Sequence, residues 1–301
     1  MEINTSVLAR YVNQFKDKPI IIKFGGDLVK DQDSLDNLCE DIHVINTLGI
    51  SVVLVHGYGP QLDELQKRMR LETKKIEGLR YTDKPTIQLI YGASGEASHD
   101  IVSTLWRHGS QAVGMAGANS GIIFTRRYFH PGENGRQIDL GYVGEPVSIS
   151  AEVIQAELDK EKIPVISSQG MDQETYEVHN VNADKTASYV ACALGAEKII
   201  YMTNTGGILR NIGDPESVIS VATPQEVTAL IEDGTVQGGM IPKVNGCIHT
   251  IKGGVKRAHI VNGYVPKALQ RELFTAKGEG TMILAAEEME KYKQELANSN
   301  L

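Results

Sequence analysis

The chain has 301 residues with ordinary globular proportions: 41% are hydrophobic, 23% are charged, and the formal net charge is −8. This acidic balance argues against bulk nucleic-acid binding, which needs basic surfaces. No run of about 18 apolar residues is present, so no transmembrane helix is expected, and no secretory signal is readable. Cys39, Cys192 and Cys247 are too far apart to suggest a disulfide framework or a zinc motif. We expect a cytoplasmic globular protein.

The first 70 residues alternate between helix and strand patterns. Apolar residues at helical spacing predict a helix over residues 5–15. A β-branched run predicts a buried strand over residues 20–24, followed by a helix over residues 35–48. Another strand follows over residues 51–55, and Pro60 suits the start of the next helix. This alternation predicts a parallel sheet with helices on its faces.

The alternation weakens between residues 114 and 147, where glycines separate short β-like segments that we interpret as hairpins on the sheet edge. No linker divides the chain, but a boundary near Gly195 separates an N-terminal lobe, 1–195, from a C-terminal lobe, 196–301, that shares the same sheet. The predicted fold is α/β, a three-layer αβα sandwich with a mainly parallel sheet. Later elements are predicted as strands at 163–167, 198–203, 258–261 and 280–283 and as helices at 184–194, 224–233, 244–251 and 287–295.

Two glycine clusters follow neighbouring predicted strands. Gly25 and Gly26 end the first strand, and Gly57 and Gly59 follow the second. Ligands bind beyond the carboxyl ends of strands in open α/β sheets, and glycine lets backbone amides approach anionic oxygens. Lys23 lies in an otherwise apolar strand, where a lysine is costly to bury without a partner. It is either a surface lysine at a sheet edge or a fixed positive charge beside a phosphate.

The common nucleotide motifs are absent or incomplete. No Gly-Lys dipeptide occurs, so there is no Walker A loop. Gly57 and Gly59 begin a dinucleotide fingerprint, but Leu62 occupies the place of the third glycine. A Rossmann-type oxidoreductase is therefore the second interpretation from these residues.

Two further segments carry polar residues where strands meet helices. Asn180, Asn182 and Asp184 alternate, so they either cap the following helix or present a polar face toward the first strands. Lys243 follows Gly238-Gly239 and enters the next predicted helix. Lys243 is either a functional lysine at the start of this helix or a solvent-exposed lysine on a helix turn.

Taken together, these segments resemble the amino acid kinase family, and its acetylglutamate kinase branch in particular. The resemblance runs from about residue 7 to residue 283. The motifs that carry it are KFGG at 23–26, VVLVHGYGPQLDEL at 52–65, GLRYTD at 78–83, DLGYVGE at 139–145, HNVNADKTA at 179–187, DGTVQGGMIPKV at 233–244 and ELFTAKGEGTMI at 272–283.

The resemblance implies ATP-dependent phosphorylation of the side-chain carboxylate of N-acetyl-L-glutamate in arginine biosynthesis. Lys23 and Lys243 would neutralise the transferring phosphoryl group, and Asp184 would hold both lysines. Arg80 would clamp the substrate α-carboxylate, a planar task that suits arginine, and Asn180 would be a second anchor. The backbone N–H groups around the γ-phosphate would come from Gly25, Gly26, Gly57 and Gly59.

The cofactors implied are ATP and Mg²⁺, with the metal bridging phosphates and no separate protein metal site. The ATP-binding residues implied are Thr203, Gly206, Gly238 and Gly239. The chemistry of this reaction is consistent with these residues. A carboxylate is already ionised at neutral pH, so phosphoryl transfer to it needs positioning and charge neutralisation rather than a general base. The alternatives are a kinase for a related N-modified aminoadipate and a non-catalytic module that senses an amino acid.

Some positions depart from the family pattern. Asp27 replaces a frequent asparagine, Tyr58 stands where relatives carry a small residue, and Lys267 replaces a frequent histidine near the region of an arginine effector site. The helix over residues 5–15 resembles the extra helix of hexameric relatives that arginine inhibits. It predicts a homo-oligomer with a dimer core, extended to a hexamer when this helix interlaces dimers, and arginine as an effector.

Overall fold

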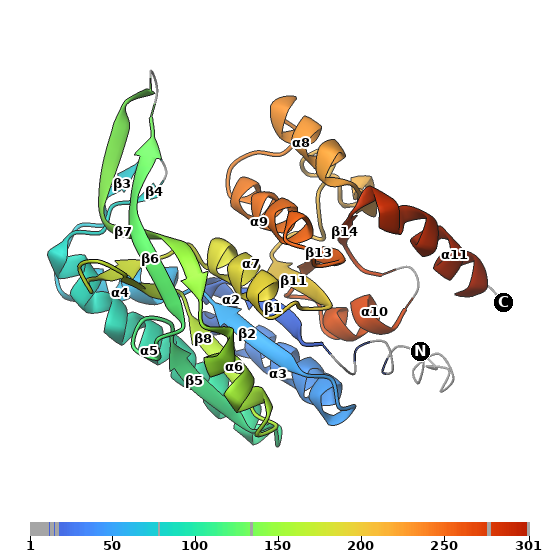
Figure 1. The fold of residues 1–301 in the computed structure, drawn as a ribbon, viewed down its shortest axis with the longest axis horizontal. Helices are drawn as coiled ribbons and strands as arrows, with labels where there is room; N and C mark the ends of the chain where they lie inside the picture. The colour runs from blue at the N-terminus through green and yellow to red at the C-terminus, as the bar shows by residue number, and fades with distance from the viewer. Residues whose placement is uncertain are drawn as a thin grey trace.

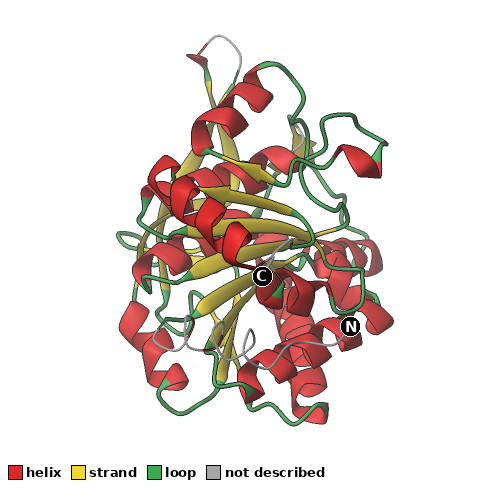
Figure 2. Ribbon diagram, turned by 90° about the vertical axis from the view of Figure 1, so that its right-hand side faces the viewer, coloured by secondary structure: helices red, strands yellow, loops and turns green. Residues whose placement is uncertain are grey.

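The computed structural model describes residues 12, 15, 18–77, 79–132, 135–275 and 278–299. Its centre is an eight-stranded sheet with helices on both faces (Figure 1, Figure 2). In spatial order the strands are β12 (Val221–Ala222), β14 (Thr281–Leu284), β13 (Arg257–Asn262), β11 (Lys198–Thr203), β1 (Ile20–Phe24), β2 (Val52–His56), β8 (Ile163–Ser167) and β5 (Ala112–Ala116).

The sheet is mainly parallel, as predicted. Strand β1 pairs in parallel with β2 on one side and with β11 on the other, and β14 is antiparallel to β13. Because β1 belongs to the first half of the chain and β11 to the second, one sheet runs through both predicted lobes. Successive strand residues point to opposite faces, so Ile20 and Ile22 enter one apolar core while Ile21 enters the other.

The helices fall into two layers that cover these two cores. Leu35 and Ile42 bury one face of α3 against the first core, and Val190 and Val244 contribute to the second. No described helix is long and apolar enough to cross a membrane. The first layer contains α2 (Gly26–Lys30), α3 (Gln32–Thr47), α4 (Gly59–Arg68), α5 (Lys84–Arg107) and α10 (Ala268–Phe274); the second contains α6 (Ala151–Leu158), α7 (Ala183–Ala193), α8 (Pro224–Glu232) and α9 (Met240–Lys252). A further helix, α11 (Met289–Ser299), ends the described chain.

The glycine-rich middle of the chain differs from its prediction. Its long hairpin does not extend the main sheet but projects beyond it, at the upper left of Figure 1. Close packing explains why glycines occur here: a Cβ on Gly144 would lie 2.6 Å from Cβ of His179, and one on Gly170 would lie 2.3 Å from Thr125. The hairpin strands β6 (Ile123–Pro131) and β7 (Gln137–Ile149) close a small barrel with β9 (Gln169–Asp172) and β10 (Val178–Asn180), and a separate short ribbon joins β3 (Lys75–Ile76) to β4 (Leu79–Arg80).

The predicted helix over residues 5–15 lies mostly outside the described residues. Of its apolar stripe, Val12 and Phe15 are described, and both pack against the first core of their own chain. Phe15 is fully buried, and Lys198 Nζ lies 4.7 Å from the centre of its ring.

Candidate active site

The glycine loops after β1 and β2 lie side by side, because these strands are parallel neighbours and their carboxyl ends meet at one edge. A Cβ on Gly57 would lie 3.8 Å from Cα of Gly25 and 3.5 Å from the Gly26 nitrogen. The N–H of Gly57, one of the predicted phosphate donors, donates to the Phe24 carbonyl at 3.0 Å in this structure. The predicted donors that this bond leaves unaffected are Gly25, Gly26 and Gly59.

Asp184 is placed by the start of α7. Asn182 is the N-cap, and its side-chain oxygen accepts hydrogen bonds from the backbone N–H groups of Asp184 and Lys185 at 2.8 and 3.1 Å. This cap turns the Asp184 side chain toward the sheet, where it is buried. Its Oδ1 lies 2.6 Å from Lys23 Nζ, and its Oδ2 lies 3.6 Å from Lys243 Nζ. One carboxylate therefore holds two lysines from different ends of the chain.

The two ammonium groups of this cluster share the Asp184 carboxylate, and Lys23 is 6% exposed. Asp27 lines the adjacent small cavity with both lysines and is a second carboxylate near Lys243. Burial lowers the pKa of Lys243 below its usual range, and the nearby Lys23 charge lowers it further, although Asp184 opposes both effects. A phosphoryl group beside the two lysines would contact two ammonium groups.

A small cavity of about 160 Å³ lies beside this cluster and extends toward the end of β11. Thr203 lines it, and the Thr203 hydroxyl accepts a hydrogen bond from the Thr205 N–H at 2.9 Å. Gly239 caps α9, and its carbonyl accepts a hydrogen bond from Lys243 at 3.2 Å. Of the predicted ATP-binding residues, Gly206, Gly238 and Gly239 do not line this cavity. The lining residues are Lys23, Gly25, Asp27, Leu28, Met202, Thr203, Asn204, Lys243 and Tyr264.

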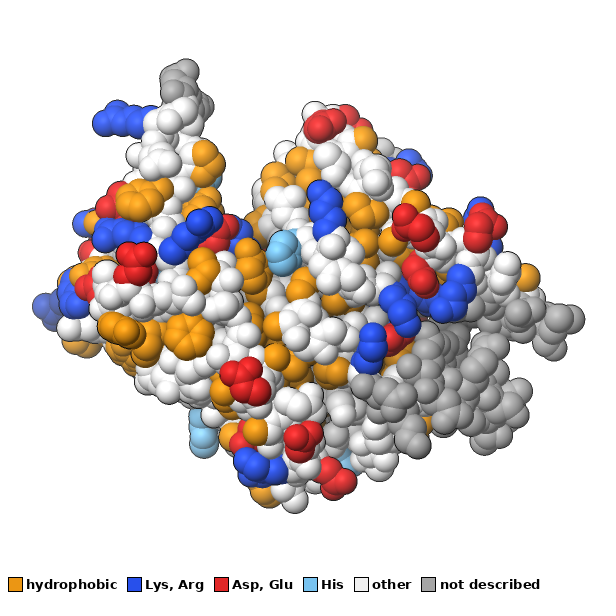
Figure 3. Space-filling view, in the orientation of Figure 1, with side chains coloured by type: hydrophobic (Ala, Val, Ile, Leu, Met, Phe, Trp, Pro, Cys, Tyr) orange, Lys and Arg blue, Asp and Glu red, His pale blue; other side chains and the backbone are white. Residues whose placement is uncertain are grey.

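A larger cavity of about 600 Å³ lies on the other side of the glycine loops, below the β6–β7 hairpin. Figure 3 shows the surface hollow between this hairpin and the part of the molecule that carries α8 and α9. Gly57 and Gly59 line the cavity together with Arg80 and Asn180. The predicted substrate anchors thus face one space, next to the lysine cluster.

Arg80 already has acceptors within its own chain. Its guanidinium donates to Asp63 at 2.6 Å and to Gln66 at 2.9 Å. These contacts hold the side chain in the cavity wall at 17% exposure. A substrate carboxylate here would compete with Asp63 or share the guanidinium with it. The amide of Asn180 is bonded to Tyr58 and Thr82.

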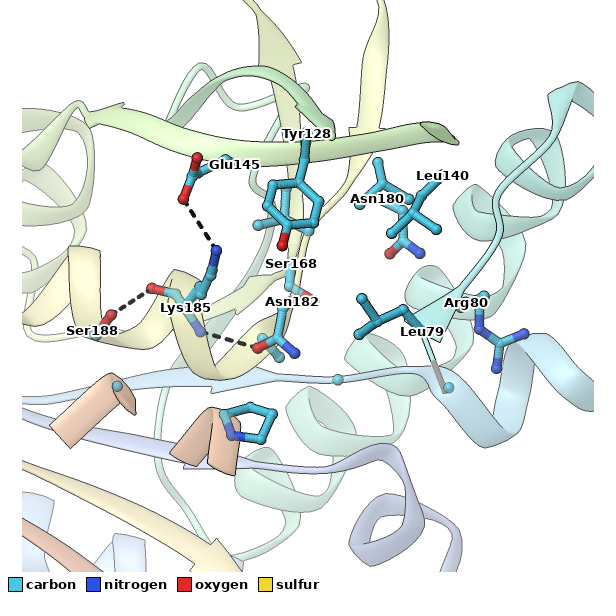
Figure 4. A pocket seen from close by; sticks show the side chains of 18 of the residues that line it. Leu79, Arg80, Tyr128, Leu140, Glu145, Ser168, Asn180, Asn182, Lys185 and Ser188 are labelled. Carbon is cyan, nitrogen blue, oxygen red and sulfur yellow. Dashed lines mark hydrogen bonds and ion pairs between the residues drawn. The ribbon is translucent and has the colours of Figure 1, made fainter. Parts of the chain in front are cut away.

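The opposite end of the larger cavity has residues that the sequence analysis did not single out. Figure 4 shows Arg80 at one end and the ion pair of Glu145 with Lys185 at the other. This pair spans 3.1 Å, and Lys185 Nζ lies 4.8 Å from the centre of the Tyr128 ring. Burial raises the pKa of Glu145, but Lys185 and Arg126 outweigh that effect and bring it below its usual range. The DLGYVGE and HNVNADKTA motifs contain Glu145 and Lys185, yet neither motif predicts that the two side chains meet.

Acid–base and metal chemistry have few candidate residues in the described part of the chain. No group of three His, Cys, Asp or Glu side chains there is arranged to hold a metal ion. His56 is fully buried at the end of β2, and burial lowers its pKa to about 4. It is therefore neutral near pH 7. What the site offers is fixed positive charge, backbone amides and two adjoining cavities.

Comparison with curated proteins gives full-length relatives. An acetylglutamate kinase from Methanothermobacter thermautotrophicus is 39% identical over 280 residues, covering 91% of this chain and 95% of the relative. An acetylglutamate kinase from Methanothrix thermoacetophila is 38% identical over 274 residues, covering 91% of this chain and 94% of the relative.

Solved structures share the fold. N-acetylglutamate synthase from Neisseria gonorrhoeae, complexed with coenzyme A and N-acetyl-glutamate, superposes with a TM-score of 0.80 at 24% identity; the alignment covers 94% of this chain and 64% of that longer one. Carbamate kinase from Giardia lamblia bound to AMP-PNP gives a TM-score of 0.65 at 16% identity, covering 89% of this chain and 98% of that one. Residues 18–262 match the amino acid kinase family as a whole. The chain belongs to the amino acid kinase family.

Proposed function

We propose that the chain phosphorylates the side-chain carboxylate of N-acetyl-L-glutamate with ATP, as part of arginine biosynthesis. The observation that carries the proposal is the Asp184 carboxylate held between Lys23 and Lys243, two lysines that line the smaller cavity. The smaller cavity suits the phosphate end of a nucleotide, and the larger one suits an acylated amino acid. The relatives named acetylglutamate kinase support this choice of substrate.

The proposed reaction is a direct transfer. A carboxylate oxygen of the substrate attacks the γ-phosphorus of ATP, the bond to the β-phosphate oxygen breaks, and ADP leaves as an acyl phosphate forms. The attacking carboxylate is ionised near pH 7, so no residue has to remove a proton. Lys23 and Lys243 stabilise the charge on the transferring group, and Asp184 keeps them correctly spaced.

The remaining roles follow the two cavities. Arg80 binds the substrate α-carboxylate and Asn180 binds its acylamino group, while Gly25, Gly26 and Gly59 direct amides toward the phosphoryl group. In this proposal residues 1–195 form the substrate lobe and residues 196–301 form the ATP lobe, with Thr203, Gly206, Gly238 and Gly239 near the nucleotide. Mg²⁺, supplied together with ATP, would neutralise part of the phosphate charge.

The proposal includes a cytoplasmic location, a homo-oligomer with a dimer core, and arginine as an effector. The effector region around Glu272 is already occupied by internal contacts. The buried Glu272 carboxylate accepts hydrogen bonds from His259 and from the Glu279 N–H. Lys267 adds a charge of the same sign as arginine. We therefore propose that arginine inhibits weakly, which a titration of activity against arginine measures.

A coupled assay of ADP release tests the substrate. The enzyme is given ATP and Mg²⁺ with N-acetyl-L-glutamate, with N-acetyl-aminoadipate, or with free L-glutamate. We expect the highest kcat/KM with N-acetyl-L-glutamate. A higher kcat/KM with N-acetyl-aminoadipate would indicate that the enzyme acts on the longer N-modified amino acid instead. Ligand-induced thermal stabilisation without turnover would instead identify a sensing module.

A further inference from the structure

Tyr58 occupies an unusual place for a large side chain, between the two glycines of the loop after β2. It is the N-cap of α4, and the residue is 4% exposed and belongs to the first apolar core. Tyr58 also lines the larger cavity, as do Gly59 and Leu62. A tyrosine here therefore both fills space and brings a hydroxyl group into the site.

The hydroxyl group of Tyr58 contacts the Asn180 amide directly. It donates to Asn180 Oδ1 at 2.9 Å, and the Ser168 carbonyl is a second acceptor at 3.0 Å. The other end of the amide, Asn180 Nδ2, donates to the Thr82 hydroxyl at 3.2 Å. Burial raises the pKa of Tyr58, so the hydroxyl stays protonated and remains a donor.

These bonds hold the amide in the orientation that the structure shows. An asparagine amide can turn by 180° and exchange its oxygen with its nitrogen when no partner distinguishes them. In this structure the Tyr58 hydroxyl donates to the amide oxygen, and the hydroxyl of the fully buried Thr82 accepts from the amide nitrogen. The second hydrogen of Asn180 Nδ2 is then held in one direction, which pre-organises it for an acceptor in the cavity.

We propose that Tyr58 is a positioning residue, which orients Asn180 toward the acylamino carbonyl of the substrate, and that its ring limits the size of the acyl group. This inference rests on the proposed function, because it deepens the substrate role of Asn180. The ring occupies volume that a small residue would leave open, so the wall next to Leu62 is closed against wider acyl groups.

Replacing Tyr58 by Phe separates orientation from volume, because only the hydroxyl group is lost. We expect the KM for N-acetyl-L-glutamate to rise about threefold to tenfold, the usual range for one neutral hydrogen bond. The KM for ATP and kcat should stay within about twofold, since no reacting group changes. Tyr176→Phe is the control, because that tyrosine is 73% exposed in a turn away from both cavities.

A double-mutant cycle shows whether Tyr58 acts through Asn180. In an Asn180→Ala background, Tyr58→Phe should cause no further rise in the KM for N-acetyl-L-glutamate. Tyr58→Gly then tests the ring: the kcat/KM ratio of N-butyryl- to N-acetyl-L-glutamate should increase relative to the unmodified enzyme. Thermal melts establish that each variant is folded.

An unchanged KM for Tyr58→Phe, or an equal effect with and without Asn180, overturns the inference even if the enzyme turns over N-acetyl-L-glutamate. An unchanged acyl-chain ratio for folded Tyr58→Gly overturns the size limit. Absence of N-acetyl-L-glutamate turnover in the unmodified enzyme contradicts the proposed function, and this inference fails with it.

Discussion

At the scale of single residues, the site depends on the sharing of one carboxylate by two ammonium groups. Lys23 comes from β1, Asp184 from α7 and Lys243 from α9, so three separate elements must dock correctly to form the cluster. The shorter contact, between Lys23 and Asp184, is buried on both sides. Removing one partner of such a pair is costly, because the other charge is left uncompensated.

The first prediction concerns Lys243→Ala. We expect kcat to fall on the order of 10²–10³, because the charge acts on the transferring group in the transition state. The KM values should change little. Lys252→Ala is the matched control, since Lys252 is an exposed lysine in the same helix. Steady-state kinetics decide: an unchanged kcat with a raised KM for ATP would make Lys243 only a nucleotide clamp.

A second prediction concerns pH. Since burial lowers the pKa of Lys243, the free enzyme loses this positive charge at a lower pH than an ordinary lysine would. The protonated form is the active one, so kcat/KM should decline on the alkaline side as the proton is lost. Lys243→Arg should move the decline to higher pH, because arginine stays charged. The pH profile of kcat/KM measures both, and an unshifted profile in the arginine variant would assign the decline to another group.

At the scale of elements, α9 must pack closely on the sheet to bring Lys243 into place. Gly246 lies one turn after Lys243, and a Cβ there would lie 2.5 Å from the Tyr201 hydroxyl oxygen. Tyr201 is fully buried, and its hydroxyl donates to the Asp184 carbonyl at 3.4 Å. The close packing of α9 on β11 and α7 therefore requires glycine at position 246, where any side chain would clash with Tyr201.

Gly246→Ala should therefore reduce both stability and turnover. We expect a loss of about 1–3 kcal/mol in the free energy of unfolding, the usual cost of overpacking. Turnover should fall as well, because α9 carries Lys243. Gly95→Ala in α5 is the control: nothing lies within 4 Å of the added Cβ, so stability should be unchanged or higher. Urea unfolding and steady-state assays measure the two effects, and an unaffected Gly246→Ala enzyme would contradict the close packing.

The contact between α3 and α10 predicts a pH-dependent stability. Asp41 accepts hydrogen bonds from the Leu269 N–H and the Gln270 side chain, yet burial raises the pKa of Asp41 to about 6. The folded state thus holds this proton more tightly than the unfolded state, whose pKa is near 3.8. The contribution of Asp41 to the free energy of unfolding should decrease as the pH rises from about 4 to 6, by up to about 3 kcal/mol.

Asp41→Asn removes this titration. Urea unfolding of both proteins between pH 4 and 7 isolates it, because the other groups are common to the two chains. As the pH rises across that interval, the unfolding free energy of the parent should decrease relative to that of Asp41→Asn. A constant difference would show that Asp41 does not titrate in the folded protein.

At the scale of the whole molecule, the sequence predicts those strands, helices and site residues that are encoded by short local patterns of residues. The β-branched run at residues 20–24 gives the central strand, and the family motifs name Lys23, Asp184 and Lys243 before any contact is visible. The sequence predicts hairpins between residues 114 and 147 but misplaces them on the edge of the main sheet, because glycine-rich segments have no side-chain pattern that distinguishes a sheet edge from a separate barrel. The pairing of Glu145 with Lys185 depends on long-range docking, which sequence spacing does not reveal.

Assembly is a further prediction at this scale. The described residues Val12 and Phe15 pack on their own chain; Phe15 is fully buried there and Val12 is partly buried. We still expect a homo-oligomer with a dimer core and a larger assembly that requires the segment over residues 5–15. Removal of residues 1–10 takes away part of that segment and should leave the dimer core. Keeping Val12 and Phe15 in the truncated chain preserves the core. Mass in solution by light scattering decides, and an unchanged oligomeric state would show that residues 1–10 are not an assembly element.

The central claim is that the lysine cluster transfers a phosphoryl group to a carboxylate. Trapping the product with hydroxylamine tests it most directly, because an acyl phosphate gives a coloured hydroxamate whereas other phosphorylated products do not. With ATP, Mg²⁺ and N-acetyl-L-glutamate, we predict hydroxamate formed in equal amount to ADP and strongly reduced in Asp184→Asn. Formation of ADP without hydroxamate, or the same yield in Asp184→Asn, would contradict the account.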